Sequence, residues 1–441
     1  MKKRSMKVLF LLLVFLISVP ILGARKKITI WCTDKEAPAL NSMKMDYKKE
    51  QKIDVEIVIK RAIGGSGFSI TAWQGGDAPD IVVGNSGVMV ELAKQNSIAE
   101  LSLTSTQISK YHPNSIQAQT YNGKIYGVPL NLASLALLYN KSLLKEPPKT
   151  WEELITVAKK LTNQSLGKSG FLYGIDNNFY PNFLFPASQG GYVFKWDAVK
   201  KEYQTLDIGL DNPGAIEGFK FIYRLVQEGV VPPSTSNDVA QNQFMEGKVA
   251  MIMDGPWRLR NYAEKIDVGV AKLPTLKGKK STPFVEVKGM MINAGSKLKR
   301  EAMDFVLNYA GEYKGQLEMF KVTGIPPAHI EASNAVVKSE PIIKPFLDSA
   351  LDGIVLPNVF AMHYAFMYGA RIIDLFKKGE VSVENAVNTQ VKMMREIIAE
   401  KVCVESCTAD YQKCMQKASQ NESKKTACMN KMTACSSKCK K

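Results

Sequence analysis

The sequence is poor in the side chains and motifs that most often mark an enzyme. Its 441 residues include only three histidines, His112, His329 and His363, and these lie too far apart to show the ligand spacing of a metal site. There is no Gly-x-Ser-x-Gly nucleophile motif and no glycine-rich phosphate-binding loop. We therefore expect no cofactor, no metal and no catalytic residue, although two carboxylates can always meet in space without a local motif.

Cysteine is nearly absent from the first 400 residues. Cys32 is alone there, in an apolar segment that predicts a strand, and we expect it to be a small buried side chain. The other six cysteines lie between residues 403 and 439. Such a cluster in an exported chain favours disulfide bonds, because compartments outside the cytoplasm are oxidising.

Long apolar runs are also missing, except at the N-terminus. Four basic residues there precede an unbroken apolar run from Val8 to Ile17, which Pro20 interrupts before the small residues that end at Ala24. This three-part pattern predicts that residues 1–24 are a signal peptide rather than an uncleaved membrane anchor. No cysteine follows the run to accept a lipid, so we expect a soluble protein in the periplasm.

Acidic residues are fewer than basic ones, 42 against 58, which gives a formal net charge of +16. The excess is spread along the chain and is not clustered with aromatic residues. This distribution favours a solvated basic surface and argues against nucleic-acid binding. Hydrophobic residues make up 45% of the chain, so it is globular, and its length suits two domains of ordinary size.

Strands and helices alternate at the start of the mature chain. Residues 53–59 alternate between apolar and polar side chains, as half-buried strands do. Because strand–helix–strand repeats form parallel sheets, we expect such a sheet, with a cleft at the loops after Cys32 and Val83. The elements predicted here are strands at 28–32, 53–59 and 80–83, a helix at 38–51, and a helix through Trp73 that ends at Gly75-Gly76.

The same alternation continues through the rest of the chain. Residues 121–129 are typical of a hairpin, and Thr150 and Glu153 form a capping box for a helix that runs to residue 161. Pro256 suits the first turn of a short helix that carries Trp257. Further strands are predicted at 135–139, 249–253 and 268–272, and further helices at 214–228, 238–246, 299–311 and 381–399.

Six motifs occur in an order that matches one protein family. Among them are Gly-Gly-Asp-Ala-Pro-Asp-Ile, Tyr-Asn-Gly-Lys-Ile-Tyr-Gly-Val-Pro, and a segment that leads into Gly-Pro-Trp. Their order and spacing resemble the extracellular solute-binding proteins of bacterial ATP-driven importers (ABC transporters), above all the maltose- and maltodextrin-binding proteins. The similarity covers roughly residues 27–399. The motifs lie at residues 75–81, 121–129, 138–141, 147–154, 190–192 and 244–257.

The resemblance implies an α/β chain with the two-lobed periplasmic-binding-protein fold, which has a hinge and an interlobe cleft. Lobe one would consist of residues 25–131 and 287–325, and lobe two of residues 136–284 and 330–399. Such a protein captures a small carbohydrate, here with maltose or a maltodextrin as candidates, by closing its lobes. It then delivers the ligand to the membrane permease of the importer, and we expect it to act as a monomer.

Two other classes of function stay open at this stage. One is an extracellular scaffold or adhesion protein that reuses the binding-protein body. The other is a glycoside-acting enzyme, whose two carboxylates would have to assemble in space. Product formation from a bound oligosaccharide distinguishes the enzyme from a binding protein.

Aromatic rings are expected in the cleft because they cover the flat apolar face of a sugar ring. By the resemblance, Trp257 of the Gly-Pro-Trp motif stacks on a sugar and Tyr180 lines the second lobe. Tyr368 and Arg371 lie in a segment similar to the family's C-terminal aromatic segment. The alternative for Trp257 is a structural role in the core. The alternative for Arg371 is that its aliphatic side chain packs along the helix surface.

Polar side chains are expected to pair with the hydroxyls of the sugar. Asp34 and Lys35 follow the first strand, where the family has an acid–lysine pair that contacts hydroxyls, and a solvated turn is the alternative. Asn85 and Ser86 lie in the loop after the third strand, which faces the expected cleft. With Asn131, at the end of the first lobe-one segment, they complete the set of candidate ligand-binding residues.

The chain departs from the maltose-binding pattern at several of these places. The loop at residues 84–88 lacks the family's tryptophan and acid–arginine pair. Ala133 stands where the family has an acid, and Met367 where it has a tryptophan. Because buried polar contacts set specificity, these losses favour a carbohydrate ligand without fixing it as a maltodextrin.

Residues 400–441 lie beyond the resemblance. Between successive cysteines there lie 3, 6, 13, 6 and 3 residues, a mirror-symmetric spacing. At about 100° per residue, each group of three falls on one helix face, which predicts an antiparallel helical hairpin turning near Asn421. We predict the disulfides Cys403–Cys439, Cys407–Cys435 and Cys414–Cys428.

The alternative for this tail is a metal site, but its cysteines lack the close pairs of most thiolate sites. A segment of about 40 residues is too small to hold itself by a core alone, so covalent cross-links are expected. Its purpose is left open between a partner-docking element and a protease-resistant end.

Overall fold

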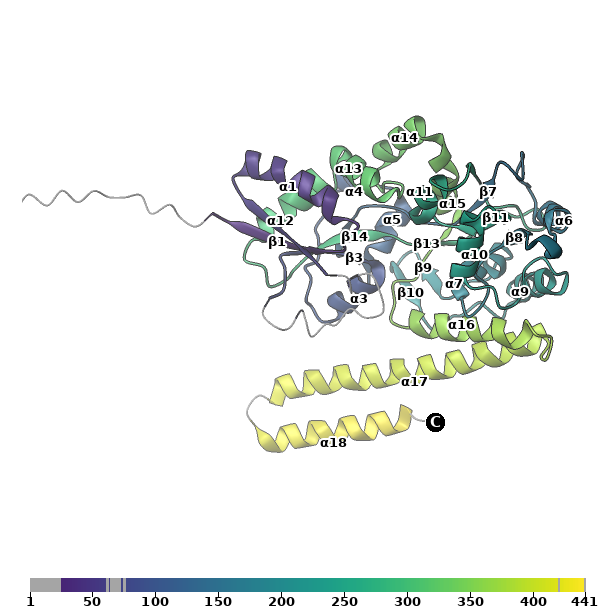
Figure 1. The fold of residues 1–441 in the computed structure, drawn as a ribbon. Helices are drawn as coiled ribbons and strands as arrows, with labels where there is room; N and C mark the ends of the chain where they lie inside the picture. The colour runs from purple at the N-terminus through teal and green to yellow at the C-terminus, as the bar shows by residue number, and fades with distance from the viewer. Residues whose placement is uncertain (1–24, 61–62, 64–72, 74–76, 419–420, 440–441) are drawn as a thin grey trace, which may run out of the picture.

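Two β-sheets organise the body of the protein, and each forms the centre of one lobe (Figure 1). The computed structural model describes residues 25–60, 63, 73, 77–418 and 421–439. The predicted signal peptide lies outside these residues, as does the predicted helix ending at Gly75-Gly76 apart from Trp73. Trp73 is helical and buried, with its ring centroid 6.1 Å from that of Trp31.

The sheet of lobe one begins with parallel strands, as predicted. β1 (Lys27–Cys32) pairs in parallel with both β2 (Asp54–Ile59) and β3 (Ile81–Asn85). β14 (Lys288–Ile292) comes from much later in the chain and pairs antiparallel with β3 and with β6 (Gly127–Pro129). The order is therefore β2-β1-β3-β14-β6, with α1 (Ala37–Gln51) and α3 (Ser86–Lys94) following β1 and β3.

The sheet of lobe two has the order β12-β7-β11-β8. Its helix α6 (Trp151–Leu161) begins with the predicted capping box, since the Thr150 side chain accepts from the Glu153 amide and the Glu153 carboxylate from the Thr150 amide. The Trp151 ring is fully buried against Phe171, Phe185 and other rings of this core. The strands are β7 (Ala136–Asn140), β8 (Ser169–Leu172), β11 (Val249–Asp254) and β12 (Val268–Ala271), with α9 (Pro213–Gln227) and α10 (Asn237–Met245) also in this lobe.

Shorter elements complete the two lobes. β4 (Thr120–Tyr121) and β5 (Lys124–Ile125) form the predicted hairpin, and its turn residues Asn122 and Gly123 both have positive φ, which suits asparagine and glycine. The predicted helix at 299–311 is α12 (Lys299–Phe305), which continues as one π-helical turn. The others are α4 (Ser105–Ile108), α5 (Pro113–Ala118), α7 (Phe179–Asn182), α8 (Leu184–Ser188), β9 (Lys195–Asp197), β10 (Glu202–Gln204), η3 (Pro256–Arg258), α11 (Leu259–Ala263), β13 (Phe284–Val285), α13 (Tyr313–Thr323), α14 (Ile330–Ser339), α15 (Lys344–Asp352), β15 (Ile354–Val355) and α16 (Met362–Phe376).

Three extended segments run side by side where the chain passes between the two sheets. Ala133 and Glu286 exchange two backbone hydrogen bonds of 2.8 and 2.9 Å. On the other side of the first segment, the Leu132 amide donates to the Pro326 carbonyl at 2.9 Å. These three segments join β6 to β7, β13 to β14 and α13 to α14, and together they form the hinge region of the two-lobed fold.

The C-terminal tail is an antiparallel pair of helices, α17 (Val383–Ala418) and α18 (Glu422–Cys439). The predicted cysteine pairing is confirmed: the disulfides Cys403–Cys439, Cys407–Cys435 and Cys414–Cys428 have Cα–Cα distances of 5.6, 5.8 and 5.7 Å. The predicted end of a helix at residue 399 is wrong. α17 crosses that position without a break because neither glycine nor proline interrupts residues 383–418.

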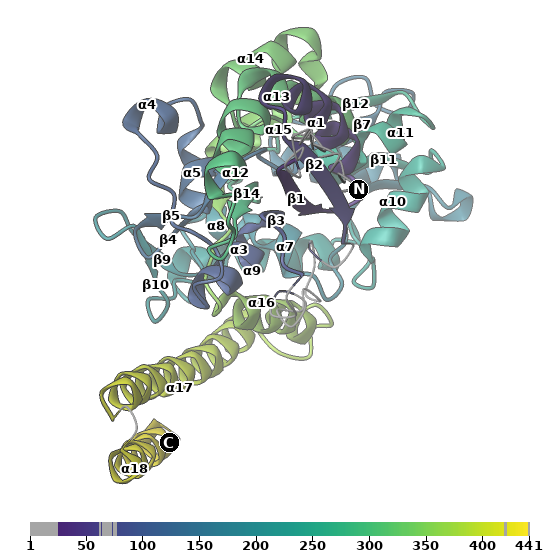
Figure 2. The same ribbon diagram turned by 90° about the vertical axis from the view of Figure 1, so that its left-hand side faces the viewer.

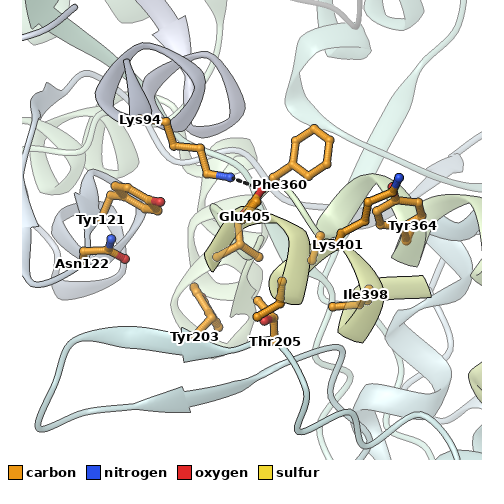
Figure 3. Close-up of a pocket in the computed structure, with 13 residues that line it drawn as sticks. Lys94, Tyr121, Asn122, Tyr203, Thr205, Phe360, Tyr364, Ile398, Lys401 and Glu405 are labelled. Carbon is orange, nitrogen blue, oxygen red and sulfur yellow. Dashed lines mark hydrogen bonds and ion pairs between the residues drawn. The ribbon is translucent and has the colours of Figure 1, made fainter. Parts of the chain in front are cut away.

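α17 leaves the body partway along its length (Figure 2). Its buried apolar side chains on the body end at Ile398, and beyond that point only Cys407 and Ala418 are buried. Where it leaves, it closes a cavity of about 190 Å³ between the two lobes (Figure 3). Lys94 and Tyr121 line this cavity from lobe one, Tyr203 and Phe360 from lobe two.

Among the described residues, no helix combines the length and the apolarity that a bilayer crossing requires.

Candidate ligand-binding site

A cavity of about 470 Å³ lies between the lobes beside the hinge. Four separate parts of the chain line it: the loop after β1, the crossing segments, the turn after β11 with α11, and the end of α13. The lining side chains that carry the argument below are Asp34, Lys35, Glu36, Asn131, Ala133, Trp257, Arg260, Glu286 and Lys288.

Trp257 forms the aromatic wall of the cavity. The buried strand β11 and the short helix η3 that follows it position the ring, which is partly exposed and packs against the lobe-two core. The ring folds back over Gly255, where an added Cβ would lie 2.2 Å from ring atoms. The Gly-Pro-Trp motif therefore holds the ring at the cavity, as expected for a ligand-stacking residue, while part of the ring packs on the core that was the alternative.

Asp34 and Lys35 are exposed at the cavity, in the loop after β1. Next to them Glu36 is buried, with its carboxylate 2.6 Å from the Lys288 ammonium and accepting from the Thr33 hydroxyl. Burial by itself raises the pKa of Glu36, but the ion pair and these hydrogen bonds outweigh it and hold the pKa below its ordinary value. Glu36 is thus charged, and its ion pair with Lys288 fixes the cavity wall next to Asp34 and Lys35.

Asn131 and Glu286 lie at the floor of the cavity, on the crossing segments. The side-chain oxygen of Asn131 accepts a hydrogen bond from the backbone amide of Lys288 at 3.1 Å. The side-chain NH₂ group of Asn131 has no partner among the described residues. One Glu286 carboxylate oxygen accepts from the Asn85 side-chain amide at 3.3 Å. Glu286 stands opposite Ala133, so a carboxylate does line the cavity there, although the sequence pattern predicted none.

Asn85 and Ser86 lie on the lobe-one side of the cleft, at the end of β3 and the start of α3. Asn85 caps α3 by accepting from the Val88 amide, and Ser86 is the first residue of that helix. Both line a neighbouring cavity of about 420 Å³, which Phe360 and Phe366 of lobe two also line. Because the Asn85 amide reaches Glu286, the two cavities meet at this hydrogen bond.

Tyr180 lies close to this site without lining either cavity. Its ring centroid is 5.8 Å from that of Phe284, and its hydroxyl is buried with no hydrogen-bond partner among the described residues. Burial, together with the negative charges of Glu286 and Asp254, raises the pKa of Tyr180 well above its ordinary value. The hydroxyl therefore stays a hydrogen-bond donor.

Tyr368 and Arg371, like Tyr180, line neither of the two cavities. Both stand on α16, where Tyr368 packs partly buried against the lobe-two core and Arg371 is exposed. Sequence reasoning also missed Glu36, Arg260, Glu286 and Lys288, because isolated charged residues in loops and crossing segments follow no periodic pattern.

Arg260 joins the two sides of the cleft. Its guanidinium group, on α11 of lobe two, donates to the Val322 carbonyl at 2.9 Å and to the Phe320 carbonyl at 3.4 Å. Both carbonyls belong to the last turn of α13, where a cation also interacts favourably with the helix dipole. Any change in the angle between the lobes alters these contacts.

The cavity combines one exposed aromatic face with donors and acceptors of both charges. A sugar has a flat apolar face and a rim of hydroxyls that both donate and accept, so its surface matches this lining.

The one cluster of possible metal ligands found among the described residues is Cys403, Cys407 and Cys439, and the sulfurs of these cysteines are joined in disulfides.

The sequence profile of bacterial extracellular solute-binding proteins matches residues 43–345. The chain belongs to this family. Among curated relatives, the maltodextrin-binding protein MdxE of Bacillus subtilis is 28% identical over 86% of this chain and 91% of its own. The galactooligosaccharide-binding protein of the same species is 28% identical over 71% of this chain and 76% of its own.

Among solved structures, a cyclo/maltodextrin-binding protein complexed with maltotetraose is similar to this solute-binding protein. The two are 27% identical, the TM-score is 0.79, and the match covers 85% of this chain and 98% of the other. This match confirms the predicted two-lobed α/β fold. The family and these relatives are binding proteins by description, and the family is extracellular.

Proposed function

We propose that this solute-binding protein captures an oligosaccharide in the interlobe cleft and delivers it to the membrane permease of an ABC importer. The observation that carries the proposal is the position of Trp257. Its ring faces a cavity whose other walls hold the charged and amide groups of Asp34, Lys35, Asn131 and Glu286. A stacking ring beside paired donors and acceptors is the arrangement that a sugar ring fits best.

The relatives support a ligand of several sugar units. One is named for maltodextrin, one for galactooligosaccharide, and the similar solved structure contains maltotetraose. The two adjoining cavities, about 470 and 420 Å³, offer room for more than one unit along the cleft. Maltodextrins and galactooligosaccharides differ in hydroxyl geometry, so the polar floor of the cleft decides between them.

The proposed function also assigns the lobes, the oligomeric state and the location of the protein. Lobe one consists of residues 25–131 and 287–325, and lobe two of residues 136–284 and 330–399. Closure of these lobes removes water from the cleft and makes its few polar contacts selective. The protein acts as a monomer in the periplasm after loss of residues 1–24, and it binds its ligand without transforming it.

A thermal-shift panel tests the proposal. Maltose, maltotetraose, galactooligosaccharides, a peptide mixture and inorganic anions are added to the mature protein. A ligand that binds only the folded state adds about 2.7 kcal/mol at a concentration of one hundred times its Kd, which raises the melting temperature. We expect a shift with an oligosaccharide, compaction by small-angle scattering, and no product. A shift with peptides or anions alone contradicts the proposal.

A further inference from the structure

The side-chain amide of Asn131 is a buried donor without a hydrogen-bond partner among the described residues. Its side chain is 2% exposed and lines the interlobe cavity. The carbonyl oxygen of this side chain is held by the Lys288 amide at 3.1 Å, which fixes the direction in which the NH₂ group points. Buried polar groups in folded proteins nearly always have a partner, so an unpartnered one at a cavity points to a ligand.

Glu286 is the acceptor that complements this donor. One of its carboxylate oxygens is held by the Asn85 amide at 3.3 Å, and the other accepts no hydrogen bond from a described residue. The backbone of Glu286 is fixed by its two hydrogen bonds with Ala133. Residue 133, which pairs with Glu286, carries only a methyl group, and both residues line the cavity.

The crossing segments bring Asn131 and Glu286 to the same cavity. Ala133 pairs with Glu286, and the Asn131 side chain binds the backbone of Lys288, two residues further on. Because both side chains line one cavity, a single ligand there can reach both. Each hydrogen bond spans about 2.7–3.2 Å, so two adjacent hydroxyls of one ring can bridge the two side chains.

We propose that Asn131 and Glu286 select the ligand by taking two neighbouring hydroxyls of one sugar ring. The Asn131 amide donates to one hydroxyl oxygen, and the next hydroxyl donates to the free Glu286 oxygen. Asn85 is a positioning residue, since it holds the carboxylate in place from the N-terminus of α3. This inference rests on the proposed function and names the feature of the substrate that the cleft floor recognises: a vicinal diol.

Selectivity follows from the buried polar groups that a mismatched ligand leaves without hydrogen bonds. When a bound sugar lacks one of the two hydroxyls, either the buried carboxylate oxygen or the buried amide has no hydrogen-bond partner. Sites built to hydrogen-bond a hydroxyl reject analogues without it far more strongly than apolar pockets reject an extra group. The same sugar with the hydroxyl in the other configuration is rejected for the same reason.

The test compares variants and ligands in one cycle, measured by isothermal titration. The probe is whichever of maltotetraose and the galactooligosaccharides shifts the melting temperature most, with its monodeoxy derivatives. The variants are Glu286→Ala, Glu286→Gln and Asn131→Asp, with Glu264→Gln as a control on an exposed surface outside the cavity. Folding of each variant is checked by its thermal transition, and binding is counted per folded molecule.

We expect the parent to bind one deoxy derivative about 10- to 100-fold more weakly than the full ligand. Glu286→Ala should weaken binding of the full ligand by a similar factor and no longer distinguish the two. Asn131→Asp should do the same for the neighbouring hydroxyl, and Glu264→Gln should match the parent. If sugars bind but these variants behave like the parent, the inference is wrong and the proposed function stands. If only peptides or anions bind, both are wrong.

Discussion

The Lys94 ammonium lies 3.1 Å from a carboxylate oxygen of Glu405, and this ion pair joins α3 of lobe one to α17 just beyond the body (Figure 3). The same ammonium stands 5.0 Å from the centre of the Phe360 ring, which belongs to the chain before α16. Lys94 therefore contacts the other lobe and the tail at once. These contacts place the exit of the hairpin at the junction of the two lobes.

Removing this ion pair should loosen the exit of the tail. We expect Glu405→Gln to speed amide hydrogen exchange in residues 398–406 by no more than about five-fold, since a largely exposed ion pair contributes up to about 1 kcal/mol. Exchanging the two charges, with Lys94→Glu and Glu405→Lys together, should restore the parent's rate. Glu100→Gln, which breaks an exposed ion pair with Lys124 elsewhere on lobe one, is the control and should leave these residues unchanged.

Trp257→Ala should weaken ligand binding without unfolding the protein. Loss of the stacking ring removes about 1–3 kcal/mol of binding free energy, which corresponds to a Kd about 5- to 150-fold higher. The melting temperature without ligand should change little, because the ring is only partly buried. Trp196→Ala is a matched control, since Trp196 packs on Tyr203 in the β9–β10 hairpin, away from both cleft cavities. If Trp257→Ala unfolds while binding per folded molecule is unchanged, Trp257 is a core residue and not a ligand-stacking residue.

Cys32 should be unreactive in the folded protein. Its thiol is fully buried in β1, and burial, with the nearby charge of Glu36, raises the pKa of Cys32 to about 12. The folded state keeps this proton between about pH 9 and pH 12, whereas the unfolded state loses it, so this group lowers stability as the pH rises through that window. Iodoacetamide should therefore label Cys32 at pH 8 only after denaturant is added. Labelling at the same rate in native buffer would contradict the buried position.

Much of the fold could be predicted because its signals are local. The alternation of strand and helix from β1 to β3, the hairpin turn at Asn122-Gly123 and the cap of α6 at Thr150 each depend on residues a few positions apart. The antiparallel strand β14 could not be placed from such signals. It enters the lobe-one sheet some 200 residues after β3, and only tertiary packing decides that pairing.

The site was predicted unevenly for the same reason. Asp34 and Lys35 follow a predicted strand and Trp257 belongs to the Gly-Pro-Trp motif, and the structure brings them to one cavity with Asn131. Glu286 carries no motif; it matters because the hinge sets it opposite Ala133 and within reach of Asn85. Contacts between residues 201 apart in the chain leave no trace in periodicity or spacing.

The hairpin disulfides should protect the tail and leave the body unaffected. Each bridge adds about 2–4 kcal/mol by restricting the open chain. Reduction should therefore melt the helical signal of residues 406–439, while the thermal transition and ligand binding of the body persist. Circular dichroism and titration on the same reduced sample make the comparison. Loss of binding on reduction would show that the tail supports the cleft.

The arrangement of the sulfurs predicts which bridge can rearrange. The Cys439 sulfur lies 3.7 Å from that of Cys407, although each is bonded to a different partner. In Cys403→Ser, the freed Cys439 thiolate can attack the Cys407–Cys435 bridge, form Cys407–Cys439 and release Cys435 as the thiol. In the matched variant Cys414→Ser, the freed Cys428 is not part of this sulfur cluster, so the other two bridges should stay as they are. Peptide mapping at pH 8 without reductant should find two pairings of Cys407 in the first variant and one in the second. A single pairing in both would mean that the helices hold the Cys439 thiolate out of line for attack.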